Sequence, residues 1–137
     1  MSLGVTLHID GASRGNPGPA GIGAVVEFND GRPAMELFSY IGETTNNVAE
    51  YRALVMALEE AARLAPASSL TVHSDSELLV RQLNGQYKVK AAHLVPLHME
   101  ARRLLSAFSS VRVTHVPREE NRKADSLANL AIDRRLE

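Results

Sequence analysis

The sequence predicts an α/β protein with one mixed β-sheet that carries helices on both faces. Three observations favour this class: a period-2 hydrophobic pattern near the N-terminus, a change to helical periodicity after residue 45, and alternating strands and helices from there on. The 137 residues are enough for one domain with its own core, so we expect a single domain over residues 1–137.

The first three strands are expected to form an antiparallel meander. Apolar and polar residues alternate over residues 5–10, which is the pattern of a strand. The following segment, GASRGNPGPAG, is dense in glycine and proline and predicts a loop over residues 11–21. Two further strands, residues 21–28 and 34–42, flank the segment NDGRP, whose Asp-Gly pair is a strong hairpin signal.

Helices and strands alternate in the rest of the chain. Apolar residues recur at helical spacing from residue 46 to about residue 65, and Pro66 ends this helix. After it we expect strands at residues 69–75 and 110–116, and helices at residues 76–85, 94–108 and 120–136. A right-handed crossover through the long helix places the fourth strand parallel to the first, and the fifth strand is expected to share that direction.

The pattern Thr-x-His-x-Asp occurs twice, as TLHID at residues 6–10 and as TVHSD at residues 71–75. If the two strands are adjacent and parallel, Asp10 and Asp75 meet at one edge of the sheet. Facing carboxylates repel each other, and a bound divalent cation relieves the repulsion. Each acid also has a purely structural explanation, Asp10 in the turn after a strand and Asp75 as the N-cap of the next helix.

Two further acids can join this edge. Glu50 lies at the margin of the apolar stripe of the long helix and can reach the sheet, although a capping box begun by Asn47 also explains it. Asp125 opens the last helix, where an acid favours the helix dipole. His8 and His73 are expected to be packed interior residues, because an all-oxygen site suits Mg²⁺ or Mn²⁺ and imidazoles favour zinc.

Composition excludes some classes and leaves others open. Cysteine is absent, which excludes disulfides and thiolate metal sites, and a cytoplasmic setting fits. No apolar run approaches the ~18 residues of a membrane span. Residues 1–80 hold 4 Lys/Arg and 10 Asp/Glu, whereas residues 81–137 hold 11 and 6. This asymmetry fits a cation bound by one half and a polyanion by the other, or it arises by chance.

Four segments together resemble, in order, the motifs of type 1 ribonuclease H: HIDGASRGNPGPAGIGAVV, TTNNVAEYRAL, HSDSELLVRQLNG and HVPREENRKADSLANLA. The resemblance implies the ribonuclease H-like fold and hydrolysis of the RNA strand of RNA–DNA hybrids, which leaves a 5′-phosphate and a 3′-hydroxyl. It implies two Mg²⁺ ions, with Mn²⁺ as an alternative, on four carboxylates: Asp10, Glu50, Asp75 and Asp125.

The resemblance also implies further site residues. Polar groups near the minor groove and backbone of the hybrid are expected at Asn16, Asn46 and Asn47, a phosphate contact at Thr45, and electrostatic contacts at Arg14, Lys88 and Lys90. Turn chemistry, capping and solvated surface explain these residues equally. In relatives a loop histidine assists water activation or product release, and here either His115 or Arg118 can take that place.

Two departures from the family pattern limit these expectations. The connector QYKVKAAH is short and the chain has no tryptophan, so a basic insertion found in many relatives is absent and hybrid affinity should be modest and salt-dependent. Glu77 stands where relatives often have a glutamine, so the base contact made at that position is not expected here.

The other hypotheses are a non-catalytic nucleic-acid-binding module, a DNA nuclease of this fold such as a junction resolvase and, more remotely, a glycosidase. We expect a monomer without membrane contact or obligate protein partner.

Overall fold

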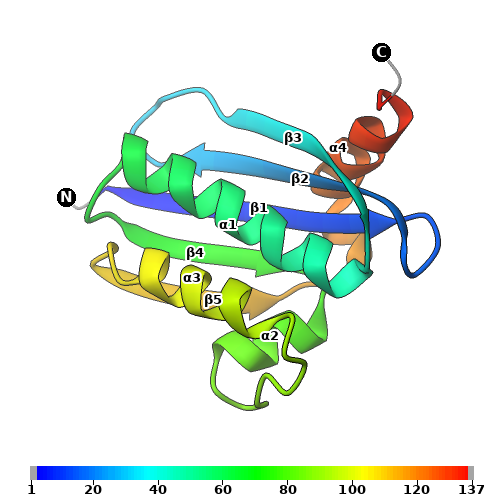
Figure 1. Cartoon of the computed structure of the whole chain (residues 1–137). Coiled ribbons are helices and arrows are strands. Elements are labelled where there is room, and N and C mark those ends of the chain that lie inside the picture. The colour runs from blue at the N-terminus through cyan, green and yellow to red at the C-terminus, as the bar shows by residue number, and fades with distance from the viewer. Residues whose placement is uncertain (1–2, 136–137) are drawn as a thin grey trace.

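The computed structural model describes residues 3–135, which form three layers, with a sheet between two layers of helices (Figure 1). In these residues one five-stranded sheet has the order β3-β2-β1-β4-β5. The strands are β1 (Gly4–Ser13), β2 (Gly18–Phe28), β3 (Met35–Thr44), β4 (Ser69–Ser74) and β5 (Ser110–His115). The helices are α1 (Asn46–Leu64), α2 (Glu77–Leu83), α3 (Val95–Leu105), the 3₁₀ helix η1 (Arg118–Glu120) and α4 (Arg122–Asp133).

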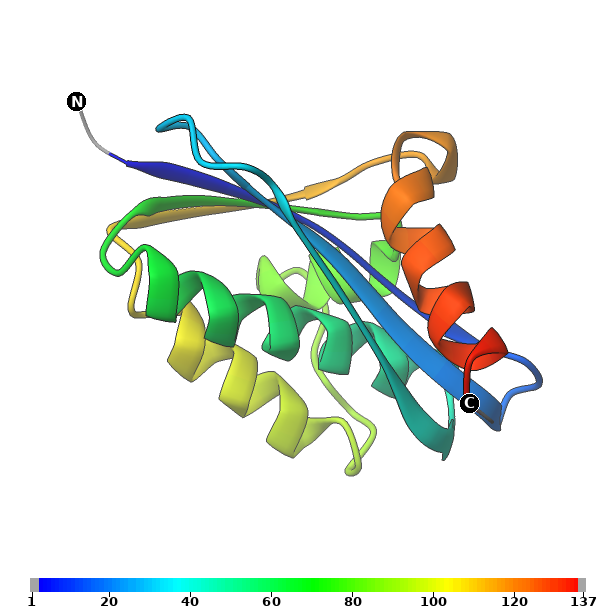
Figure 2. The same ribbon diagram turned by 90° about the horizontal axis from the view of Figure 1, so that it is seen from above.

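The central strand β1 pairs antiparallel with β2 and parallel with β4. The outer pairs are β2 with β3, antiparallel, and β4 with β5, parallel. Seen along the sheet, α1 and α3 cover one face and α4 covers part of the other (Figure 2). The predicted meander, the parallel direction of the fourth and fifth strands and the helices on both faces are therefore confirmed.

The core between α1 and the sheet consists mainly of small and branched apolar side chains. On the α1 side the fully buried residues are Ala49, Ala53, Leu54, Ala57, Leu58 and Ala61, and on β1 they include Leu7 and Ile9. Each fully buried leucine or isoleucine contributes about 1.5–3 kcal/mol. The helix ends at Leu64, before Pro66, as the sequence predicts.

The prediction of a loop over residues 11–21 is wrong, because most of this segment is strand. β1 continues to Ser13 and β2 begins at Gly18, which leaves residues 14–17 as the turn. Two glycines of the segment allow close packing against helices on opposite faces of the sheet, Gly11 against α1 and Gly21 against α4. Pairing with a neighbouring strand then supplies the extended conformation that local sequence does not favour.

The boundaries of the last helices also differ from prediction. α3 ends at Leu105, short of residue 108, and α4 begins at Arg122, after the separate 3₁₀ turn of η1. In the part of the chain that the structure describes, no helix combines the length and the hydropathy that a membrane crossing requires.

Candidate active site

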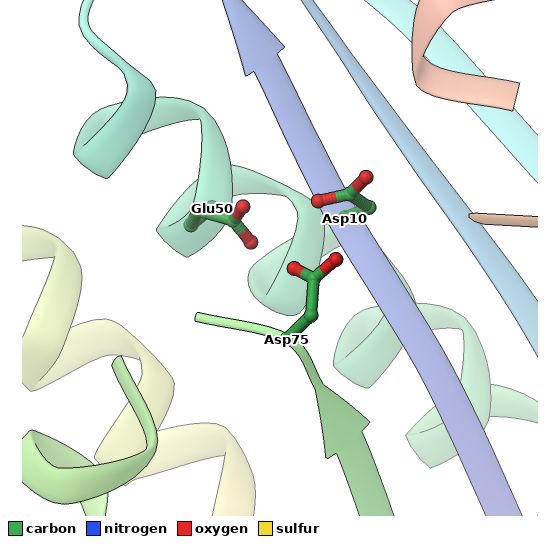
Figure 3. A group of neighbouring side chains, drawn as sticks. All are labelled: Asp10, Glu50 and Asp75. Carbon is green, nitrogen blue, oxygen red and sulfur yellow. The ribbon is translucent and has the colours of Figure 1, made fainter. Parts of the chain in front are cut away.

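Three carboxylates meet where the pairing of β1 with β4 ends (Figure 3). The last parallel pair is Ile9 with Ser74, so Asp10 and Asp75 follow it side by side. An oxygen of Asp10, one of Glu50 and one of Asp75 all lie within 4.8 Å of one another. The sequence suggested that the first strand ends at Asp10, but β1 continues to Ser13. Only its parallel pairing ends there, and this brings the two aspartates together.

Glu50 reaches the two aspartates because α1 lies directly against β1. A Cβ atom added to Gly11 would lie 2.3 Å from the carbonyl carbon of Ala49 and 2.5 Å from the backbone nitrogen of Glu50. Any side chain at position 11 would therefore push the helix away from the strand. Glu50 is 8% exposed, which agrees with its predicted orientation toward the sheet.

The structure excludes the capping explanations for two of the acids. Thr45 is the N-cap of α1 and its hydroxyl accepts a backbone N–H, so Asn47 does not begin a capping box with Glu50. Ser76 is the N-cap of α2, so Asp75 does not serve that purpose. Both carboxylates instead line the cavity described below.

Asp125 lies in the first turn of α4 and lines the same cavity, but it stands outside the group of three. Gly23 allows α4 to approach the sheet, because a Cβ atom there would lie 2.4 Å from the carbonyl oxygen of Ala124. Asn121, which is buried, donates its side-chain amide to the carbonyl of Ile9 at 2.8 Å. The beginning of α4 is thereby fixed against β1 beside the acids.

Burial keeps protons on the cluster when no cation is present. Burial raises the pKa of Asp10 to about 8, against a hydrogen bond with Glu50 that lowers it. The pKa of Glu50 is also raised, by burial first and by the charge of Asp10 second. Burial raises the pKa of Asp75 as well, although the nearby Arg118 guanidinium opposes this shift. The three carboxylates thus need a positive partner to be ionised together at neutral pH.

The donor set fits a divalent cation. Oε2 of Glu50 is buried and has no hydrogen-bond partner among the described residues. A buried carboxylate oxygen without a donor is costly, and a bound cation removes that cost. The cluster offers only oxygen atoms, which suit hard cations such as Mg²⁺ or Mn²⁺.

A cavity of about 430 Å³ surrounds the acids and is lined by two of the residues predicted to contact substrate. Arg14 and Asn46 are part of its wall. Asn16 lies beside it, and its side-chain oxygen accepts the backbone N–H of Asn46 at 3.1 Å. This hydrogen bond connects the turn after β1 to the first residue of α1.

Four other predicted substrate residues do not line the cavity. Thr45 and Asn47 flank Asn46 at the start of α1, next to the opening. Lys88 and Lys90 are exposed on the connector between α2 and α3.

The structure separates the two candidates for the assisting residue. His115 is the last residue of β5, is exposed and does not line the cavity. Arg118 does line it, and its Nη2 atom lies 3.9 Å from Oδ1 of Asp125. A guanidinium therefore occupies the rim of the cavity, close to the acids.

His8 and His73 are not the packed interior residues that the sequence predicted. The two are paired in register across β1 and β4, and their rings lie edge to face with centroids 5.0 Å apart. Nε2 of His8 lies 2.5 Å from Oε1 of Glu27. Both histidines are half-buried, because α4 covers β1 to β3 on this face and leaves β4 open.

Sequence reasoning missed Gly11, Asn121 and Asn129 as residues that shape the site. Asn121 and Asn129 stand four positions before and after Asp125, which places Asn121 at the N-cap of α4 and Asn129 one turn after Asp125. That spacing was available in the sequence. What it could not indicate was which atoms the two amides would contact.

The comparisons with known proteins agree with this geometry. The family described as Reverse transcriptase-like matches residues 8–131. The chain is 46% identical over 130 residues to the bifunctional protein Rv2228c of Mycobacterium tuberculosis, covering 94% of this chain and 35% of that protein. It is 44% identical over 129 residues to ribonuclease HI of Halobacterium salinarum, covering 94% and 64%. The chain therefore spans less than two thirds of either relative.

Solved structures are similar over nearly the whole chain. The N-terminal RNase H domain of Rv2228c from M. tuberculosis has a TM-score of 0.91 at 45% identity, with 96% of this chain and 95% of that chain covered. RNase H1 from H. salinarum gives 0.89 at 44%, covering 95% and 98%. LC11-RNase H1 in complex with RNA/DNA hybrid gives 0.87 at 42%, covering 98% and 99%. From its fold, its sequence motifs and these similarities, the chain belongs to the type 1 ribonuclease H family.

Proposed function

We propose that this chain is a metal-dependent endoribonuclease that hydrolyses the RNA strand of RNA–DNA hybrids. The observation that carries the proposal is the group of Asp10, Glu50 and Asp75, whose oxygens lie within 4.8 Å of one another in a cavity. A module that only binds nucleic acid gains nothing from clustered negative charge facing a polyanion. The similar LC11-RNase H1, solved in complex with RNA/DNA hybrid, supports the class of substrate.

The carboxylates are the proposed ligands of two Mg²⁺ ions, with Mn²⁺ as an alternative. Asp10, at the centre of the sheet edge between Glu50 and Asp75, is the proposed bridging ligand, and Asp125 completes the set from α4. Two such ions would supply an activated water and stabilise charge on the leaving 3′-oxygen, which yields 5′-phosphate and 3′-hydroxyl ends. The protein's part is to hold these four carboxylates at fixed positions on four separate segments: β1, α1, the turn after β4, and α4.

Recognition of RNA requires groups that read the 2′-hydroxyl. Asn46 lies on the cavity wall, and Asn16 is connected to it by a hydrogen bond of 3.1 Å, so both are proposed contacts in the minor groove. Asn47 and Thr45 are placed at the N-terminus of α1, where backbone N–H groups and the helix dipole favour a phosphate. We assign them to the nucleic-acid backbone.

Arg118 is the proposed assisting residue, in place of the histidine used by relatives. Its guanidinium lies at the cavity rim, 3.9 Å from Asp125, whereas His115 lies at the end of β5 outside the wall. A guanidinium cannot act as a base at neutral pH. Its proposed role is therefore to orient the substrate phosphate and help the charged product leave.

The proposed domain acts with modest affinity for its substrate. The connector between α2 and α3 carries Lys88 and Lys90, both exposed, but has no tryptophan. Attraction by such lysines is screened by salt, so hybrid cleavage at low substrate concentration should fall steeply as salt increases.

Cleavage of labelled duplexes tests the proposed function. An RNA–DNA hybrid, an RNA duplex and a DNA duplex are each incubated with Mg²⁺ at low salt, with Asp10→Asn protein as the control. We expect cleavage of the RNA in the hybrid alone, and no cleavage by the variant. A hybrid that is bound but left intact would favour the non-catalytic binding module, and cleavage of the DNA duplex would favour a DNA nuclease.

A further inference from the structure

Three polar residues form a stripe along α4 that begins at Asp125. Asp125, Asn129 and Asp133 are spaced four residues apart, so their side chains lie on one side of the helix. Arg14, in the turn between β1 and β2, reaches across to this stripe. Arg14, Asn129 and Asp125 all line the cavity that holds the acid cluster.

Arg14 is bound to the two later residues of the stripe. Its Nη2 atom lies 2.7 Å from Oδ1 of Asp133. The same atom donates to Oδ1 and to the backbone carbonyl of Asn129, at 3.4 Å and 3.5 Å. The guanidinium is thus held at Nη2 by two residues of α4.

The side-chain amide of Asn129 is hydrogen-bonded in turn to Asp125. Its Nδ2 atom donates to Oδ1 of Asp125 at 3.2 Å and to the backbone carbonyl of the same residue at 3.0 Å. With Oδ1 of the amide facing Arg14 and Nδ2 facing Asp125, both neighbours require the same orientation of the amide.

We propose that Asn129 is a positioning residue that holds the Asp125 carboxylate ready for a divalent cation, with Arg14 and Asp133 fixing Asn129 in turn. The inference rests on the proposed function, in which Asp125 is a metal ligand. Asn129 engages Oδ1 of Asp125 and leaves Oδ2 for the cation.

Asp125 is one of the acids of the site that need such support. Its side chain is 30% exposed, whereas Asp10 and Glu50 are buried residues. An exposed carboxylate on a helix surface has several accessible rotamers, and fixing one of them costs entropy each time a cation binds. Partners that orient a metal ligand are commonly worth 10–100-fold in metal affinity or activity.

Two substitutions of Asn129 distinguish positioning from a general structural role. Asn129→Ala removes the donor, and we expect the Mg²⁺ concentration for half-maximal activity to rise about tenfold or more. Asn129→Asp keeps an acceptor for Arg14 but sets a second carboxylate against Asp125, so we expect a larger loss. If Asn129 serves only to anchor Arg14, Asn129→Asp will behave like the wild type, and the proposal is wrong.

A titration without substrate separates this inference from the proposed function. Mn²⁺ binding is measured by calorimetry for the wild type, for Asn129→Ala and for a matched control, Glu36→Gln. The control breaks the 3.3 Å ion pair of Glu36 with Lys123, which also joins α4 to the sheet but lies outside the cavity. We expect weaker binding for Asn129→Ala alone.

The outcomes of the two measurements are distinct. If the wild type cuts no hybrid but Asn129→Ala still weakens Mn²⁺ binding relative to Glu36→Gln, the proposed function fails and the positioning role stands. If the wild type cuts the hybrid and Asn129→Ala matches it in both Mg²⁺ dependence and Mn²⁺ affinity, the positioning role is overturned.

Discussion

The side-chain amide of Asn121 donates to the backbone carbonyl of Ile9 at 2.8 Å, across 112 positions of the chain. Ile9 directly precedes Asp10, and the backbone carbonyl of Asn121 accepts the N–H of Asp125 at 3.1 Å. One buried asparagine therefore connects the two backbone segments that carry Asp10 and Asp125. The relative position of these acids depends on this contact as well as on the packing of α4.

Replacing Asn121 with alanine should destabilise the protein and disturb the site. The carbonyl of Ile9 would lose the side-chain donor, at a cost of about 1–3 kcal/mol in the free energy of unfolding, measured with urea. The matched control is Asn84→Ala, since Asn84 donates in the same way to the carbonyl of Val113 at 3.1 Å, on β5. We expect both variants to lose stability, and only Asn121→Ala to need more Mg²⁺ for activity. Equal Mg²⁺ requirements would contradict this role.

Gly11→Ala should separate α1 from β1 at the acid cluster. The new methyl group would lie 2.3 Å from the backbone of Ala49, which cannot move without displacing Glu50. Overpacking of this kind costs about 1–3 kcal/mol, and we expect Mg²⁺ affinity to fall with it. Gly4→Ala, on the same strand, meets only side-chain atoms, of Asn29 and Ser69, and should have a smaller effect on both quantities. Similar losses in the two variants would argue against a special packing role for Gly11.

The stability of the metal-free protein should decrease as pH rises. Asp10 has a pKa of about 8 in the folded protein and an ordinary value of 3.8, so the folded state holds its proton more tightly than the unfolded state does. That contribution is complete below the ordinary value and is lost as pH rises through about 8. Melting temperatures in EDTA should therefore fall between pH 5 and pH 9, and Mg²⁺ should restore more stability at pH 9 than at pH 6.

Asp10→Asn is the variant that tests this interpretation. An amide does not ionise, so the decline in melting temperature with pH should become shallower, while the fold persists and both Mg²⁺ affinity and cleavage are lost. An unchanged pH profile in EDTA would show that Asp10 does not hold a proton in the metal-free protein. Undiminished cleavage would show that it is not a metal ligand.

Low pH should destabilise the contacts that join α1, α2 and α3. The hydroxyl of Tyr51 donates to Oε1 of Gln82 at 2.6 Å and lies 3.2 Å from Nδ1 of His98, which joins α1, α2 and α3. Burial lowers the pKa of His98, and the charge of Arg102 lowers it further. The folded state therefore prefers the neutral ring, and stability is lost as pH falls below about 6.5, the ordinary value.

Melting curves between pH 7.5 and pH 5 measure this effect. His98→Gln should show a shallower decline than the wild type, although not a flat one, because burial also lowers the pKa of His73. His93→Gln is the matched control, since His93 is exposed on the connector before α3. A decline that is equally steep in His98→Gln and the wild type would exclude His98 as the cause.

Much of the fold follows from local patterns in the sequence. Alternation over residues 5–10, helical spacing from residue 46 and the stop at Pro66 each report burial or chain geometry within a short window, so they could be predicted without a structure. The handedness of crossovers then predicted that Asp10 and Asp75 would lie side by side, and they do.

The rest was decided by contacts between distant segments. The glycines of residues 11–21 indicate a loop when only their neighbours are considered, yet this segment is mostly strand because two helices pack against its bare backbone. The hydrogen bond of Asn121 with Ile9 and that of Arg14 with Asn129 likewise depend on where α4 comes to lie. Residue types and their spacing are local properties and so determined the candidate acids. The orientation of Asp125 is a property of the packed chain, because its supporting atoms come from residues more than a hundred positions apart.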